Sequence, residues 1–396
     1  MLGDLLFVIW CLVQLFIGYN LVLPFLFFVW YSVIKKKNWR RTEFQQPDYA
    51  IIVTAYEQTH LLHAVTNSIL QSTYKNYLIY VVADKCDVSN LHFTDDRIVL
   101  LRPPETLGSN TRSHFYAINH FQRAHTHLTI IDSDNIVERN YLEELNRYFD
   151  NGFKAVQGIR KPKNLNTTLA CLDAARDIYY HYYDAEVLFN LGSSATLSGS
   201  GMAFTVQLYR ECLENNDVSG AGFDKVLQYA IVQRNLRIAY APNAVVYDEK
   251  TAASDQLVNQ RARWINTWFK YSFLGWGLLA KGIGKASRNQ FLFGIVLLRP
   301  PLFIFLILSG LFFLVNIVLL NVQALWWLVA FALFITSFFI ALSASHADKR
   351  IYDSLRNIPK FMWLQVQSLL KAKGANKRSV ATKHAGDNIK NTANEN

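Results

Sequence analysis

The sequence is poor in charged residues, and its cysteines do not follow the spacing of metal fingers or disulfide frameworks. Only 18% of the 396 residues are charged, whereas 51% are hydrophobic and 14% aromatic. This balance is too apolar for an ordinary soluble enzyme of this size and predicts membrane segments. The four cysteines form no closely spaced pair, which argues against a zinc finger or a secreted disulfide-linked domain.

Acidic residues are outnumbered by basic ones, which gives a formal net charge of +10. An excess of positive charge could indicate a nucleic-acid partner. Here, however, the basic residues lie beside apolar runs, at Lys35-Lys36-Lys37 and in the tail after Ser345. This distribution is typical of the cytosolic face of a membrane. We therefore expect a lipid bilayer as a partner and no nucleic acid.

Three apolar runs approach or exceed the length of about 20 residues that a helix needs to cross a bilayer. The first covers residues 5–34 and contains Pro24, where tilt or a kink is expected. No basic region precedes this run and no small-residue cleavage site follows it, so we interpret it as a retained anchor, not a signal peptide. The other two, 291–320 and 324–344, are separated by three residues and predict a tight helical hairpin.

The distribution of charge orients these spans. Arg299-Pro300-Pro301 interrupts the second run. Because a charge at the bilayer centre is costly, we expect Arg299 at the cytosolic interface and the start of the span near Pro301. The loop at Asn321 carries no charge and is placed outside by the positive-inside rule. We expect a multi-pass protein of the cell membrane, with about three transmembrane helices and the catalytic domain in the cytosol.

Two more segments mix aromatic and basic residues, which is the composition of helices that lie in the membrane surface. One extends from Trp268 through Trp276 to Lys281, and the other covers residues 358–370. The alternative for each is a helix that packs on the soluble domain. The chain is thus divided into an N-terminal transmembrane anchor (1–46), a cytosolic domain (47–267), an interfacial helix (268–290), a transmembrane hairpin (291–345) and a basic cytosolic tail (346–396).

The segment from Asp48 to about Asn259 alternates between short apolar strands and helices. Strands are expected at 49–54, 78–83, 98–101 and 128–131, and helices at 61–71 and 112–123. Such alternation predicts an α/β domain with a mostly parallel sheet. Ligands bind such sheets at the carboxyl ends of the strands, and Asp84 and Asp132 stand at two of these ends.

Asp132-Ser133-Asp134 places two carboxylates one residue apart at the end of a strand, where side chains at i and i+2 point the same way. Neighbouring carboxylates repel each other unless a cation lies near them, and hard oxygen ligands suit Mg²⁺ or Mn²⁺. Such an ion could neutralise a diphosphate and act as a Lewis acid for its departure. The alternative is a solvated turn, because Asp and Ser are common turn formers.

Other motifs flank this one in a regular order. They are Val53-Thr54-Ala55-Tyr56-Glu57, Ala83-Asp84-Lys85-Cys86-Asp87, Gly199-Ser200-Gly201-Met202-Ala203-Phe204, Gly222-Phe223-Asp224-Lys225 and Gln260-Arg261-Ala262-Arg263-Trp264. In this order and spacing, the region from Asp48 to Trp268 resembles the family 2 glycosyltransferases, inverting enzymes with a GT-A (Rossmann-like) fold. With the flanking apolar runs, the chain is similar to the membrane-integrated branch, which includes poly-N-acetylglucosamine, hyaluronan and cellulose synthases and ceramide glucosyltransferase.

The resemblance implies a role for each matching residue. Asp224 would be the general base that removes the proton of the acceptor hydroxyl. Asp132 and Asp134 would face the donor, with Asp134 most directly on the metal. The nucleotide pocket would be lined by Thr54, Tyr56, Glu57 and Asp84, the last facing the uracil edge. The acceptor and diphosphate end would be lined by Gly201, Gln260, Arg261, Arg263 and Trp264.

Some positions depart from the family pattern. Phe223 stands where a carboxylate usually precedes the base, and Gly108-Ser109 replaces a Gly-Lys pair after the third strand. The first motif reads Tyr-Glu-Gln instead of Tyr-Asn-Glu. Four histidines of this region are expected at the surface: His114, His120, His125 and His127.

The resulting prediction is an inverting, metal-dependent hexosyltransferase. It would move a sugar from a nucleotide sugar, such as UDP-GlcNAc or UDP-Glc, to a growing glycan or a lipid-linked acceptor in cell-surface polysaccharide synthesis. Three spans are few for a whole translocation channel, so self-association, an export partner or a lipid acceptor is left open. The alternatives are a single-addition transferase that acts on a membrane lipid and a catalytically inactive sugar-nucleotide binder.

Overall fold

Runs of β-branched and aromatic residues form the first strands of the sheet. The computed structural model describes residues 2–35, 37–40, 46–216, 218 and 220–375. These strands are β1 (Tyr49–Tyr56), β2 (Tyr77–Asp84), β3 (Ile98–Leu101) and β4 (His127–Asp132). β1 pairs in parallel with β2 and β4, and β2 pairs in parallel with β3. Their carboxyl ends therefore share one edge of the sheet, and the strands expected from the sequence are confirmed.

Four further strands complete the sheet, and the sequence analysis did not identify them. They are β5 (Ile136–Val137), β6 (Ala155–Pro162), β7 (Met202–Thr205) and β8 (Ile238–Asp248). The strand order within the described residues is β3-β2-β1-β4-β7-β6-β8-β5. β7 runs antiparallel to both β4 and β6, whereas β6 and β8 are parallel. The expected α/β domain with a mostly parallel sheet is confirmed.

Amphipathic helices cover this sheet. They are α2 (Leu62–Leu70), α3 (Asn110–Asn119), α4 (Tyr141–Phe149), α5 (Thr168–Tyr180), α6 (Leu188–Asn190), α7 (Val206–Leu213) and α8 (Phe223–Gln233). A π-helical segment, η1 (His181–Val187), continues α5. The predicted helices at 61–71 and 112–123 correspond to α2 and α3, although α3 begins two residues earlier and ends four residues earlier than expected.

The histidines expected at the surface do not all lie there. His114 and His125 are buried, with 1% and 7% of their surface exposed, and His127 is half-buried. His120 is exposed as expected. The expectation was wrong for His114 because helical periodicity turns it inward together with Ala117 and Ile118 of the same helix. Burial lowers the pKa of His114 to about 3 and that of His127 to about 4.

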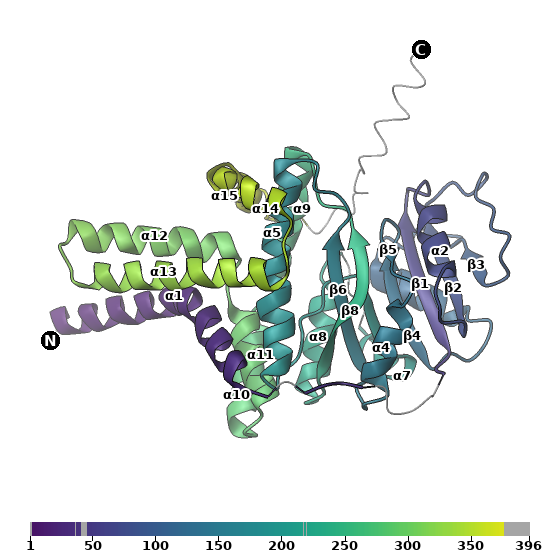
Figure 1. The fold of residues 1–396 in the computed structure, drawn as a ribbon, viewed down its shortest axis with the longest axis horizontal. Helices are drawn as coiled ribbons and strands as arrows, with labels where there is room; N and C mark the ends of the chain where they lie inside the picture. Colours follow the sequence, from purple (N-terminus) through teal and green to yellow (C-terminus); the bar gives the residue numbers. More distant parts are fainter. Residues whose placement is uncertain (1, 36, 41–45, 217, 219, 376–396) are drawn as a thin grey trace, which may run out of the picture.

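Three apolar helices project away from the sheet and lie side by side (Figure 1). They are α1 (Leu2–Val33), α12 (Leu302–Val318) and α13 (Gln323–Ala344). By length and composition α1 and α13 could each cross a membrane, and α11 (Arg288–Leu298) with α12 could form a third span bent by 70°. Two or three spans are consistent with membrane association. α1 bends along its length (Figure 1), and Pro24 inside it accounts for such a bend.

Buried amides join the three apolar helices. The Gln14 Oε1 atom of α1 accepts hydrogen bonds from Asn316 Nδ2 of α12 at 2.6 Å and from Trp327 Nε1 of α13 at 2.8 Å. Gln14 Nε2 donates to Gln323 Oε1. In a bilayer the lipid tails are as apolar as the helices, so the hydrophobic effect does not drive helices together. Hydrogen bonds of this kind stabilise their association instead. The start of α1 and the turn between α12 and α13 lie at the same end, away from the sheet (Figure 1).

Shorter helices lie around the junction between the sheet and the apolar helices (Figure 1). They are α9 (Ser254–Tyr271), α10 (Leu274–Gly284), α14 (Lys349–Ser354), the 3-10 turn η2 (Leu355–Asn357) and α15 (Ile358–Leu370). α9 runs without a break through the expected domain boundary at residue 267. α15 buries Phe361 and Leu364 against the domain, whereas Trp363 and Leu370 are exposed. The expected tail beyond residue 375 lies outside the described residues.

Candidate active site

The carboxyl ends of β1, β2 and β4 open into a cavity of about 880 Å³. Most of the site residues proposed from the sequence line it, although they come from distant parts of the chain. They are Thr54, Tyr56, Asp84, Asp132, Asp134, Asp224, Gln260, Arg261, Arg263 and Trp264. Parallel strands bring the first five together, whereas α8 and α9 supply the others.

Glu57 and Gly201 do not line this cavity. Glu57 has a positive φ of 61°, and its carboxylate pairs with Lys85 Nζ at 2.7 Å on the protein surface. The next residue, Gln58, lines the cavity instead. Gly201 lies behind the wall, where its backbone N–H donates to the Ile130 carbonyl. A side chain at Gly201 would meet Val246 at 3.1 Å in a backbone conformation with φ +66°, which favours glycine.

Asp84 is buried at the end of β2, and its two carboxylate oxygens hold a loop. Oδ1 accepts from the Leu107 backbone N–H at 2.9 Å and Oδ2 from the Gly108 N–H at 2.8 Å. Ser109 follows and caps α3 by accepting from the Arg112 N–H. The pair Gly108-Ser109, which departs from the family pattern, thus forms the turn that joins the part of the cavity beside Asp84 to α3.

Ser200 fixes the turn that carries Asp132 and Asp134, and the sequence analysis did not select it. Its side chain is fully buried. Its hydroxyl oxygen accepts from the Asp132 backbone N–H at 3.1 Å and from Asn135 Nδ2 at 2.7 Å. The glycine loop therefore positions the acidic turn from behind. A serine between two glycines was visible in the sequence, but its partners were not.

The acidic turn has the electrostatics of a cation site. Burial and the neighbouring Asp134 raise the pKa of Asp132 to about 7, although Arg160 opposes this shift. No three His, Cys, Asp or Glu side chains are grouped for metal binding within the described part of the chain. Two carboxylates nevertheless fit a Mg²⁺ or Mn²⁺ ion that completes its coordination with phosphate oxygens and water. Asp132 and Asp134 are the residues that would hold it.

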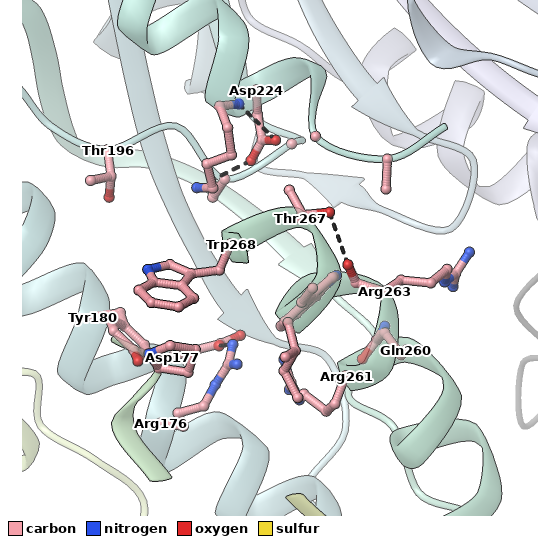
Figure 2. Close-up of a pocket in the computed structure, with 18 of the residues that line it drawn as sticks. Arg176, Asp177, Tyr180, Thr196, Asp224, Gln260, Arg261, Arg263, Thr267 and Trp268 are labelled. Carbon is pink, nitrogen blue, oxygen red and sulfur yellow. Dashed lines mark hydrogen bonds and ion pairs between the residues drawn. The ribbon is translucent and has the colours of Figure 1, made fainter. Parts of the chain in front are cut away.

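Asp224 lies in the first turn of α8 and points into the cavity from another wall (Figure 2). Its Oδ1 atom accepts from the Lys225 backbone N–H at 2.9 Å, and Oδ2 lies 3.4 Å from Lys225 Nζ. Gly222 precedes the helix with φ +107°, where a side chain would come within 2.7 Å of Thr267 and Tyr271. This close approach to α9 allows Asp224 to reach the cavity.

A largely buried network of charges, which no sequence motif indicated, forms part of the cavity wall. Arg160 pairs with Asp248. Lys250 Nζ lies 2.9 Å from Asp248 Oδ1 and 2.5 Å from Asp177 Oδ2, and Arg176 pairs with Asp177 at 2.5 Å. One signal was available, because Asp248 ends an apolar strand in the same way as Asp84 and Asp132. The pairing of Asp177 had no local signal.

The Gln260 to Trp264 motif lies on α9, where it faces the cavity. Gln260 Oε1 accepts from Thr251 Oγ1 at 3.2 Å. Arg261 pairs with Asp173, and its guanidinium lies 3.8 Å from the centroid of the Trp264 ring. The Trp264 ring, expected at the acceptor and diphosphate end, thus packs against an arginine.

Trp268, one turn further along α9, was expected in an interfacial helix but lines the cavity. In Figure 2 it lies between Asp224 and Tyr180. Its indole N–H donates to the Arg299 carbonyl at 2.9 Å. Arg299 itself, expected at the membrane interface, forms a buried ion pair with Asp184. The cavity therefore adjoins the start of the apolar helices.

Two solved structures are similar to the chain to different degrees. The mannosyltransferase PcManGT from Pyrobaculum calidifontis, solved with GDP-Man and Mn²⁺, is 14% identical, with a TM-score of 0.58 over 92% of this chain and 98% of the other. Residues 1–349 of TarS from S. aureus, solved with UDP-GlcNAc, are 14% identical, with a TM-score of 0.42 over 83% of this chain and 90% of the other. No curated protein sequence matches the chain. The model of the family described as "Glycosyltransferase like family 2" matches residues 47–267, and the chain therefore belongs to this family and is a glycosyltransferase with the GT-A fold.

Proposed function

We propose that the chain transfers a sugar from a nucleotide sugar to an acceptor hydroxyl, with inversion at the anomeric carbon. One observation carries the proposal: a single cavity joins the Asp132 and Asp134 carboxylates to Asp224 on another wall. The first pair suits the charged end of a donor, and a carboxylate on another wall suits a base that acts from the opposite face. Direct displacement requires this opposition, because the acceptor oxygen must approach opposite the leaving diphosphate.

In this mechanism each group of residues has a separate task. A divalent ion held by Asp132 and Asp134 would neutralise the diphosphate of the donor. Tyr56 and the loop held by Asp84 would enclose the nucleotide. Asp224 would accept the proton of the acceptor hydroxyl on one of its carboxylate oxygens as the new glycosidic bond forms and the bond to the diphosphate breaks. Lys225 Nζ, 3.4 Å from Asp224 Oδ2, would hold that carboxylate in place beside the acceptor.

We further propose that the catalytic domain faces the cytosolic pool of nucleotide sugars. The start of α1 and the turn between α12 and α13 lie at one end of the apolar helices, and the sheet lies beyond the other end (Figure 1). The cavity opens at the carboxyl ends of strands of that sheet. Basic residues such as Lys35 and Lys349 flank the helices on the side of the cavity. The positive-inside rule places that side in the cytosol. A cytosolic catalytic domain attached to membrane helices suits the synthesis of a cell-surface polysaccharide, which we propose as the pathway of the product.

The test is the release of nucleoside diphosphate by the purified full-length protein with a panel of UDP-GlcNAc, UDP-Glc and GDP-Man. Asp224→Asn should lower turnover by about 10²- to 10⁴-fold, the range for loss of a general base, and leave donor binding intact. Asp255→Asn, an exposed carboxylate on α9 outside the cavity, is the matched control. Unchanged turnover in Asp224→Asn would remove Asp224 as the base, and no release with any donor would contradict the proposed transfer.

A further inference from the structure

The cavity does not end at the motif on α9. It continues as an apolar extension between three helices, α12, α13 and α15. The side chains that define this extension are Phe303, Leu306, Ile335, Phe339, Ile358 and Met362. Ile335, Phe339 and Ile358 are 53%, 45% and 40% exposed. The apolar extension therefore reaches the surface of the protein beside helices that are apolar enough to lie in a membrane.

Two arginines meet where the polar cavity passes into the apolar extension. The guanidinium groups of Arg261 and Arg176 lie 3.8 and 4.7 Å from the centroid of the same Trp264 ring. Both residues line the cavity. Within the described residues, Nε of each arginine and Nη1 of Arg261 are buried without a hydrogen-bond partner. Buried N–H groups without acceptors are costly, and an anion would satisfy them.

The ion pairs around these arginines leave some of their N–H groups unused. Asp173 pairs with Arg261, Asp177 pairs with Arg176 and Lys250, and Asp248 pairs with Arg160 and Lys250. Burial raises the pKa of Asp177, but Lys250, Arg176 and Arg160 hold it well below its usual range. Even with these carboxylates in place, the Nε atoms of Arg176 and Arg261 have no acceptor within the described residues.

The arginine pair is joined directly to the membrane helices. Tyr180 lies one turn after Arg176 on α5, and its ring centroid is 5.4 Å from the Arg176 guanidinium. The Tyr180 hydroxyl accepts from the backbone N–H of Leu302, the first residue of α12, at 3.1 Å. A molecule whose anionic group bound Arg176 would therefore have the start of α12 beside it. The apolar extension begins at that point with Phe303 and Leu306.

We infer that the acceptor is an anionic lipid, with its phosphate-type head group at Arg176 and Arg261 and its hydrocarbon chain in the apolar extension. The inference rests on the proposed function, because it names the class of acceptor for that cavity. A water-soluble glycan would leave the apolar extension without a matching partner, whereas a hydrocarbon chain gains by leaving water along its whole length. The opening beside α13 would admit the chain from the bilayer.

The experiment measures binding and uses no sugar donor, so its failure is distinguishable from failure of the proposed transfer. The full-length protein in dodecyl maltoside is titrated with dodecyl phosphate, and bound molecules are counted by native mass spectrometry. Dodecylphosphocholine, which has the same chain, and inorganic phosphate, which has no chain, are the comparison probes. We expect one dodecyl phosphate bound, with clearly weaker binding of both comparison probes.

Two variants on the same helix test the position of the chain. Ile335→Trp would place a larger side chain in the apolar extension, where it would collide with the hydrocarbon chain. Binding of dodecyl phosphate should therefore weaken about tenfold. Val329→Trp is the matched control, since Val329 is 52% exposed on α13 but does not line the cavity. Equal binding by the two variants would overturn the assignment of the apolar extension.

Arg176→Gln tests the head group and should weaken dodecyl phosphate binding about tenfold, as expected for loss of a charged hydrogen-bond donor. The same change should have little effect on dodecylphosphocholine. Displacement of dodecyl phosphate by UDP or by inorganic phosphate alone would assign the arginines to the donor diphosphate or to free phosphate and overturn the inference. Equal binding of dodecylphosphocholine would also overturn it.

Discussion

The two ends of the cavity are built in different ways. At the end that we propose binds the donor (the donor end), Asp84 and Asp132 each terminate a strand, and the parallel pairing of β1 with β2 and β4 brings them to one edge. At the end that we propose binds the acceptor (the acceptor end), the important contacts join residues far apart in the sequence: Arg261 pairs with Asp173 88 positions away, and Arg299 pairs with Asp184 115 positions away. A regular sheet thus encodes the first end locally, whereas buried ion pairs across helices build the second.

The largest expected effect at the acceptor end comes from breaking one of these ion pairs. Arg299→Leu would leave Asp184 buried without its partner, because the two side chains are only 3% and 8% exposed. Removal of one partner of a buried pair costs about 3–5 kcal/mol. We expect a large fall in the thermal unfolding temperature of the protein in detergent, together with loss of turnover.

The double variant Arg299→Leu/Asp184→Leu separates the pair from general damage. Two apolar residues in place of a buried ion pair are often neutral for stability, so the double variant should recover most of the lost unfolding temperature. If Arg299→Leu alone is as stable as the parent protein, the pair does not hold α12 to the domain, and the contrast between the two ends is weaker than the structure indicates.

The corresponding test at the donor end is Ser200→Ala. It would leave the Asp132 backbone N–H and Asn135 Nδ2 without their common acceptor. A buried N–H group left without an acceptor costs about 1–3 kcal/mol of stability. Because the acidic turn would also lose its support, KM for the nucleotide sugar should rise. Ser198→Ala is the control, because the Ser198 hydroxyl is buried without a partner among the described residues. Equal effects of the two changes would show that the Ser200 hydrogen bonds do not position the turn.

The same contrast explains which features were predictable. The strands ending at Tyr56, Asp84 and Asp132 were predicted because each combines an apolar run with a polar stop. The eight-stranded arrangement was not, because β7 pairs antiparallel with β4 after a separation of about 70 residues, and nothing in its short run indicates that partner. The apolar helices were predicted by length and hydropathy alone.

Site residues follow this rule as well. Asp224 and the α9 motif were selected through resemblance to a family, and the structure places them at one cavity. Arg176 and Asp177 were not selected, because their helix carries no distinctive motif and their contacts outside it come from α9 and the segment after β8. Ionic networks of this kind depend on tertiary packing, which local sequence patterns do not contain.

The pH dependence of stability tests whether the fold keeps the buried His114 side chain uncharged. Burial lowers the pKa of His114 to about 3, from an ordinary value of 6.5. Below pH 6.5 the unfolded chain takes up a proton that the folded chain does not, so stability should fall as the pH falls. The loss is about 1.4 kcal/mol per pH unit, or about 2 kcal/mol at pH 5. His114→Gln should reduce this slope in thermal unfolding between pH 7 and pH 5.

His120→Gln is the matched control, because His120 lies at the end of the same helix but is exposed. It should leave the pH dependence of unfolding unchanged. His114 also packs against Phe223, with ring centroids 5.0 Å apart, so its protonation would disturb the residue beside the candidate base. If the two variants have the same pH profile as the parent protein, His114 is not held neutral by the fold.

The smallest expected effect tests the boundary of the donor end. Glu57→Gln should change turnover by less than about twofold, because the Glu57 carboxylate pairs with Lys85 in solvent, where such pairs contribute little. Gln58→Ala, the neighbouring change, should have the larger effect, since Gln58 lines the cavity. The resemblance to the family placed Glu57 in the pocket, beside Tyr56. A φ of 61° ends the alternation at that residue and turns its side chain outward. A tenfold loss of turnover in Glu57→Gln would mean that the Glu57 side chain turns into the cavity when the nucleotide sugar binds. The donor end would then not be fully preformed.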